Sequence, residues 1–150
     1  IGDRLAAQGD GAGALEAFRR SLAIAERLAA DDPASVEAQR DLSFSLNKIG
    51  DRLAAQGDGA GALEAFRRSL AIAERLAADD PASVEAQRDL IVSCVKLSEA
   101  DAGDAAAWLE RALGIAEALA AEGRLEPRDA WMPADLRERL EATKRAPRGD

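Results

Sequence analysis

The sequence predicts an all-α protein in which antiparallel helix hairpins stack one after another, an α-solenoid. Three observations support this fold class. Alanine occupies 36 of the 150 positions, aromatic residues make up only 3%, and Tyr is absent, a composition that favours helices over strands. Residues 1–42 recur without a single change as residues 49–90, so the chain repeats with a period of 48 residues. Within each repeat, apolar residues recur at helical spacing in two consecutive segments.

The charge and residue content argue against several classes of function. The 28 acidic residues outnumber the 20 basic ones, and the net charge of −8 has the wrong sign for a protein that binds nucleic acid. No apolar run approaches the roughly 20 residues that cross a bilayer. With no histidine and one cysteine, the usual catalytic bases, zinc ligand sets and disulfides are missing. We therefore expect no enzyme, no cofactor, no metal site, no nucleic acid and no membrane partner.

The first helix of each repeat is predicted to begin at Asp32-Pro33, with Asp as the N-cap and Pro at the first helical position. Apolar residues then follow at spacings of 4, 3 and 4, which places them on one face. These residues are Leu42, Leu46, Ile49 and Leu53. The helix is expected to end at Gly57, because glycine readily adopts the left-handed conformation found after helix ends.

The second helix is predicted to be capped by Asp58 and to run to Asp79. Its apolar stripe consists of Ala62, Phe66, Leu70, Ala73 and Leu76. Since only two or three residues join the two helices, they must fold back on each other as an antiparallel hairpin. A diverged third copy follows, in which residues 114–123 track residues 71–80.

These positions resemble the tetratricopeptide repeat family, whose pattern has a large residue and Leu-Gly on the first helix, then Ala and an aromatic on the second, then Pro. The matching residues are Leu46, Ile49-Gly50, Leu53, Ala62, Phe66 and Pro81. Two differences stand out, because leucine replaces the first-helix aromatics and the period is 48 residues instead of about 34. Each helix has gained 7 residues, close to two turns, so the same faces stay in contact. Long-helix variants of this kind occur in kinesin light chains and in large bacterial multidomain proteins, and the resemblance implies a right-handed solenoid.

The chain is expected to divide into repeats at residues 1–123 (1–48, 49–96 and a diverged 97–123) and a C-terminal capping segment and tail at residues 124–150. Gly123 is predicted to close the last repeat helix. A closing helix is then expected from Pro133 to about Arg145. Ile91 and Val95 replace polar residues of the preceding copy. We hypothesise that both lie under the terminal segment around Trp131.

The resemblance also implies a site, because in this family the first helices line a concave groove that binds partners. We expect a protein or peptide partner in this groove, with Phe44 as an apolar anchor. The expected groove residues are Asp3, Arg40, Phe44, Asn47, Lys48, Asp51, Ala55, Arg88, Val92, Val95, Lys96 and Glu99. The alternative is that Lys48 and Asp51 merely pair at i, i+3 on a solvated face.

Other candidate sites favour structural explanations. Cys94 replaces Leu46 on the apolar stripe, so we expect a small buried hydrophobe and not a nucleophile. The glycine-rich residues 57–61 follow a predicted helix, whereas phosphate-binding loops follow a strand, so a turn is expected. Asp31-Asp32 has too few neighbouring oxygen ligands for a calcium site.

The sequence begins within a first helix, since Ile1 corresponds to Ile49 and no residues matching Pro33–Lys48 stand ahead of it. We therefore expect a fragment of a longer cytoplasmic array. Two alternatives to a partner-binding scaffold stay open. One is end-to-end self-assembly into a homo-oligomer through the N-terminal end. The other is a regulatory arm of a larger multidomain protein.

Overall fold

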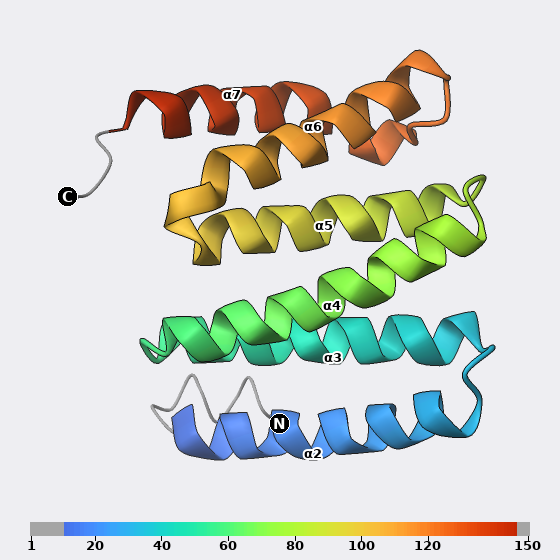
Figure 1. Cartoon of the computed structure of the whole chain (residues 1–150), viewed down its shortest axis with the longest axis vertical. Helices are drawn as coiled ribbons and strands as arrows, with labels where there is room; N and C mark the ends of the chain where they lie inside the picture. Colours follow the sequence, from blue (N-terminus) through green and yellow to red (C-terminus); the bar gives the residue numbers. More distant parts are fainter. Residues whose placement is uncertain (1–10, 147–150) are drawn as a thin grey trace. The chain divides into compact units, whose positions relative to one another are not determined.

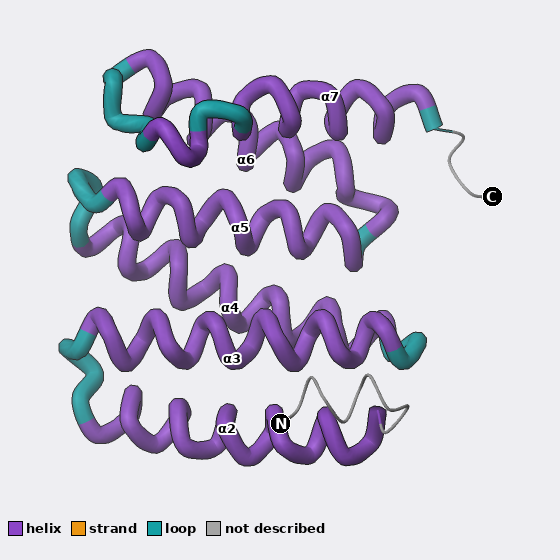
Figure 2. The backbone as a smooth tube through the Cα atoms, turned by 180° about the vertical axis from the view of Figure 1, so that it is seen from behind, coloured by secondary structure: helices purple, strands orange, loops and turns teal. Residues whose placement is uncertain are grey.

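The structure is a computed structural model that describes residues 11–146, in which six α-helices and two short 3-10 helices occur and no strand is found (Figure 1). The α-helices are α2 (Gly11–Asp31), α3 (Val36–Ala55), α4 (Gly59–Asp79), α5 (Val84–Ala100), α6 (Ala105–Ala121) and α7 (Met132–Arg145). The 3-10 helices are η1 (Ala102–Asp104) and η2 (Pro127–Asp129). Figure 2 shows the short loops that join them. The all-α prediction is thus confirmed.

The chain divides into two compact units, residues 1–76 and residues 77–150. In the first unit, α2 packs against α3, and α3 is antiparallel to α4 (Figure 1). The hydroxyl groups of Ser43 on α3 and Ser69 on α4 form a buried hydrogen bond of 2.7 Å. The predicted stripes form the core of this unit. Their buried members are Leu46, Ile49, Leu53, Ala62, Phe66, Leu70, Ala73 and Leu76, while Leu42 is half-buried.

The predicted start of the first helix is wrong by three residues. Ser35, not Asp32, is the N-cap of α3, and its hydroxyl oxygen accepts a hydrogen bond of 3.1 Å from the amide of Ala38. The amide of Ser35 donates to the carbonyl of Asp32 at 3.0 Å, so residues 32–35 form a turn ahead of the helix. Ser83 caps α5 in the same way.

The predicted helix ends are confirmed. Gly57 and Gly123 have φ values of 86° and 68°, the left-handed conformation expected after α3 and α6. The Oδ1 atom of Asp58 accepts a hydrogen bond of 2.9 Å from the amide of Gly61, so Asp58 caps the start of α4. The second helix ends at Asp79, as predicted.

Alanine substitutions at Gly57 and Gly114 should change the free energy of unfolding in opposite directions, because Gly57 has a positive φ and Gly114 lies within a helix. Gly57→Ala forces a side chain into left-handed backbone and should lower the free energy of unfolding by about 1–2 kcal/mol. Gly114→Ala lies within α6, where an added Cβ meets no atom within 4 Å, and should raise it by about 0.8–1 kcal/mol. Chemical denaturation followed by circular dichroism measures both changes. If both variants changed the free energy of unfolding in the same direction, the explanation from backbone conformation would be contradicted.

The second unit consists of α5, α6 and α7, with α6 packed against both of the others (Figure 1). The predicted closing helix is confirmed as α7, which buries Met132, Leu136 and Leu140 and exposes the charged residues Arg137, Glu138, Arg139, Glu141 and Lys144. Ile91 is buried on α5, and Cys94 is fully buried, as expected for a core position. No α-helix in residues 11–146 is long and apolar enough to span a bilayer.

Candidate functional site

A hollow of about 180 Å³ lies in the second unit, between α5 and the first half of α7. We call it the α5–α7 hollow. Four expected groove residues line it, and α7 with the residue before it supplies the opposite wall. The lining residues are Ile91, Val92, Val95, Lys96, Glu99, Trp131, Met132, Asp135, Leu136 and Arg139.

The α5–α7 hollow has an apolar floor and a charged rim. Ile91, Met132 and Leu136 are buried, whereas Trp131 is 56% exposed. Ile91 and Val95 therefore share this hollow with Trp131, as hypothesised, but Met132 and Leu136 supply the buried α7 side chains. An exposed tryptophan beside buried apolar atoms is the kind of surface on which a partner's side chain can be desolvated.

A smaller hollow of about 160 Å³ lies in the first unit and involves α2 and α3. This α2–α3 hollow is lined by Phe18, Lys48, Asp51 and Arg52. The Nε atom of Arg52 is buried and has no hydrogen-bond partner in the described structure. The hollow therefore combines one aromatic ring with charges of both signs and an unused donor.

The two hollows share a pair of repeat-related positions. Lys48 and Asp51 in the first unit correspond to Lys96 and Glu99 in the second, 48 residues later. In each unit the lysine and the acid line a hollow that also contains an aromatic side chain. The repeat therefore places the same chemistry beside an aromatic group twice.

Comparison with known proteins identifies the repeat. The profile of the tetratricopeptide repeat family matches residues 1–34 and residues 45–82. These segments are tetratricopeptide repeats. Repeats of this family generally mediate protein–protein interaction, and the match indicates no catalytic family. No curated protein matches the sequence.

The packing within the first unit agrees with the tetratricopeptide assignment. Gly50 of α3 and Phe66 of α4 are both buried and touch, so the small residue of the first helix accommodates the aromatic residue of the second. Ala62 is 0% exposed. The repeat positions of the family thus fix the hairpin and leave the opposite side of α3 available to solvent.

Other expected groove residues of α3 lie outside both hollows. Phe44 is 41% exposed, and the guanidinium of Arg40 lies over its ring, 4.9 Å from the centroid. Asn47 is half-buried, and its Oδ1 atom has no hydrogen-bond partner in the described structure. Ala55 is exposed at the last position of α3. Asp3 lies outside the described residues.

Arg88 has a structural partner. Its Nε atom donates a hydrogen bond of 2.9 Å to Oδ2 of Asp129, whose side chain is only 4% exposed. This contact ties α5 to η2, just before the residues that form the α7 wall of the hollow. Sequence reasoning missed Asp129, because nothing in a single sequence marks an acidic residue of a short loop as buried.

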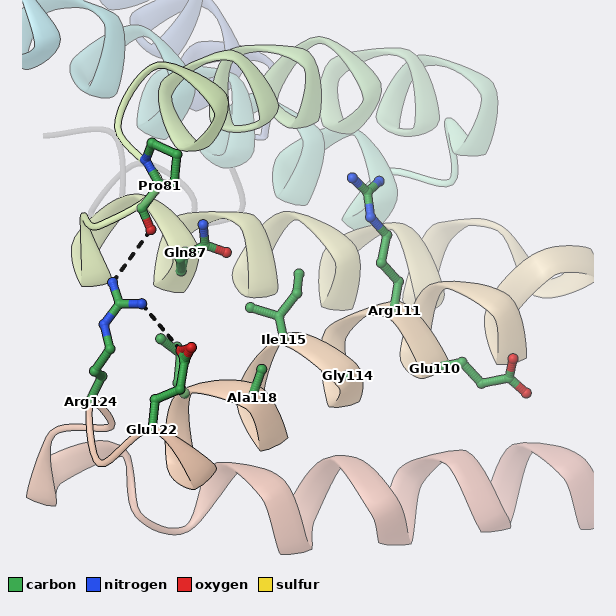
Figure 3. Close-up of a pocket in the computed structure, with 10 residues that line it drawn as sticks. Pro81, Gln87, Glu110, Arg111, Gly114, Ile115, Ala118, Glu122 and Arg124 are labelled. Atoms are coloured by element: carbon green, nitrogen blue, oxygen red, sulfur yellow. Dashed lines mark hydrogen bonds and ion pairs between the residues drawn. The ribbon is translucent and has the colours of Figure 1, made fainter.

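A further hollow of about 460 Å³ in the second unit was also not predicted (Figure 3). This α5–α6 hollow lies where Gln87 faces Ala118. In the first unit the corresponding residues are Gln39 and Arg75, joined by a hydrogen bond of 2.9 Å. Ala118 stands in the second unit at the position that Arg75 occupies in the first, so the second unit lacks the side chain that bridges the two helices. This difference between the repeats explains the α5–α6 hollow.

Arg124 closes one end of the α5–α6 hollow. Its Nη2 atom donates to the carbonyl oxygen of Pro81 at 3.4 Å, and its Nη1 atom donates to Glu122 at 3.2 Å (Figure 3). The Nη2 atom also donates to the carbonyl oxygen of Ala82 at 2.5 Å. These bonds join the turn before α5 to the end of α6.

In residues 11–146 no cluster of three His, Cys, Asp or Glu side chains is placed to hold a metal ion.

Proposed function

We propose that this chain is a protein-binding module that takes a partner peptide or helix against the first helices of its repeats. Tetratricopeptide repeats generally bind proteins, and the finer proposal concerns the surface used. The observation that carries it is the recurrence of a lysine and an acid beside an aromatic side chain. Lys96 and Glu99 accompany Trp131, and Lys48 and Asp51 accompany Phe18.

The α5–α7 hollow is the stronger of the two candidate contact points. The residues of its floor are already buried, whereas Trp131 is exposed to solvent. An apolar side chain of a partner placed on Trp131 would therefore remove water both from itself and from the tryptophan. Arg139 and Asp135 pair with each other at 2.9 Å on its rim, and Lys96 and Glu99 add one charge of each sign. The partner expected from this chemistry carries an apolar side chain flanked by charged residues of both signs.

Substitution of Trp131 by Ala should weaken partner binding about tenfold or more, because exposed tryptophans at the centre of such surfaces contribute strongly to affinity. The test begins with selection of binders from a randomised peptide library displayed on phage. Affinities of selected peptides are then measured by isothermal titration calorimetry for the wild type, Trp131→Ala and Lys96→Glu. Both variants are expected to bind more weakly with unchanged helix content.

Lys144→Glu is the matched control for the charge reversal, since Lys144 is an exposed lysine of the same unit that does not line the α5–α7 hollow. It should leave the affinity unchanged within about twofold. Selected peptides that bind the wild type and both hollow variants equally would contradict the proposal. A library that yields no specific binder would contradict it as well.

A further inference from the structure

One hydrogen bond between the helices of the first unit has no counterpart in the second. In the first unit, the Nη2 atom of Arg75 on α4 donates to the Oε1 atom of Gln39 on α3 at 2.9 Å. In the second unit, Gln87 stands in the place of Gln39 and Ala118 in the place of Arg75. Because alanine has no polar side-chain atom, the second unit keeps the acceptor of this bond but not its donor.

The side chain of Gln87 starts from the same point of its helix as that of Gln39. Ser35 caps α3 and Ser83 caps α5, and each hydroxyl oxygen accepts a hydrogen bond of 3.1 Å from an amide of the first turn. Each glutamine follows its cap by four residues. Gln87 is half-buried and lines the α5–α6 hollow (Figure 3). The second unit thus presents the same amide, at the same helix position, to this hollow.

The α6 wall of the hollow carries less positive charge than the corresponding part of α4. Glu110 stands where α4 has Arg67, so the sign of the charge is reversed. Ala118 also replaces an arginine, whereas the acid that follows it by four residues is kept as Glu122. Residues four apart on a helix are neighbours, so the Glu122 carboxylate lies beside the position of the missing arginine. These replacements favour a cation in the hollow.

Two arginines line the hollow at opposite ends, Arg124 near the end of α6 and Arg111 seven residues, or about two turns, before Ala118 (Figure 3). Arg124 is held by Glu122 and by two backbone carbonyls of the turn before α5. A carboxylate accepts several hydrogen bonds, so Glu122 can bind Arg124 and a second donor. The middle of the hollow, where Gln87 faces Ala118, therefore offers acceptors to a further cation.

We propose that the α5–α6 hollow binds an arginine side chain of a partner protein. Its guanidinium takes the position that Arg75 holds in the first unit and donates to Oε1 of Gln87 and to the carboxylate of Glu122. A guanidinium group can do both at once, because it is planar and carries several donors. The volume of about 460 Å³ is within the range of sites that hold small ligands. The inference rests on the proposed function, since the arginine belongs to a bound protein, and it assigns a second contact point to it.

N-acetyl-L-arginine amide is the direct probe, since it carries the arginine side chain and no other charge. It is titrated into the isotope-labelled full chain, and the backbone and side-chain amide resonances are followed by NMR. We expect saturable shifts, largest at Gln87 and Ala118, with a dissociation constant of about 1–10 mM. N-acetyl-L-citrulline amide has nearly the same shape without the charge and should bind at least about tenfold more weakly. Absence of saturation up to about 50 mM arginine probe would overturn the proposal.

Ala118→Arg restores the arginine of the first unit and should lower the affinity for the probe at least about tenfold, because the new side chain bonds to Gln87 and fills the hollow. Arginine favours helices, so the variant should keep its helix content. Gln87→Leu removes the acceptor and should weaken binding about three- to tenfold. An Ala118→Arg variant that binds the probe as well as the wild type would contradict the proposal.

Ala120→Arg is the matched control, since it adds the same side chain to an exposed position of α6 that does not line the hollow. It should bind the probe within about twofold of the wild type. Shifts confined to Trp131 and Met132 would place the probe in the α5–α7 hollow and would overturn this assignment. The titration uses no selected peptide, so its failure leaves the proposed function standing, and a failed peptide selection does not alter the result of the titration.

Discussion

Replacing Phe66 by Ala should lower the free energy of unfolding by about 3–5 kcal/mol. Phe66 is 2% exposed and its ring lies against Gly50 of the facing helix, so removal of the ring leaves a cavity in the core of the first unit. Because both tryptophans of the chain, Trp108 and Trp131, belong to the second unit, unfolding is best followed by circular dichroism. Guanidinium denaturation of the variant and the wild type measures the difference.

Phe18→Ala is an unusually close control for this experiment. Phe18 occupies the same position in the same 21-residue sequence, so changes in helix propensity cancel between the two variants. Phe18 is only half-buried and borders the α2–α3 hollow, and its removal should lower the free energy of unfolding by on the order of 1–2 kcal/mol. Equal losses in the two variants would show that burial of the Phe66 ring is not what stabilises the hairpin.

Local features of the fold could be predicted because they depend on short stretches of sequence. The spacing of Leu46, Ile49 and Leu53 identifies the buried face of α3 without knowledge of its partner. Gly57 and Asp58 mark the turn, since one residue accepts the left-handed conformation and the other caps α4. The N-cap of α3 was predicted incorrectly because Asp32-Pro33 and Ser35 are both good starting signals only three residues apart.

Exposure and side-chain pairing could not be predicted, because they depend on which helices are neighbours. Identical sequences bury Ile72 and expose Ile24, so no pattern within the repeat distinguishes them. The partner of Arg88 lies 41 residues away in η2. The α7 wall of the α5–α7 hollow was expected only in part for the same reason. The segment around Trp131 was expected near Ile91 and Val95, whereas the buried side chains of Met132 and Leu136 were not expected beside them.

Gly50→Ala should also be strongly destabilising, although alanine favours helices. An added Cβ at Gly50 would touch Cε1 of Phe66 and lie 2.7 Å from Cδ1 and 2.8 Å from Cζ of the same ring. Alanine within a helix is worth about 0.8–1 kcal/mol relative to glycine, and overpacking in a core costs about 1–3 kcal/mol or more. Since three ring carbons must move, we expect a net loss of about 1–2 kcal/mol, measured by the same denaturation experiment.

The diverged third copy suggests how this clash can be relieved. Ser98 stands at the position of Gly50, and Leu109 stands at that of Phe66, so a larger first-helix residue occurs together with a smaller second-helix residue. Gly50→Ala should therefore be less destabilising in a Phe66→Leu background than alone, by about 1 kcal/mol or more in a double-mutant cycle. A coupling energy of zero would show that the Phe66 ring moves aside freely, and the loss in Gly50→Ala would then need a cause other than this contact.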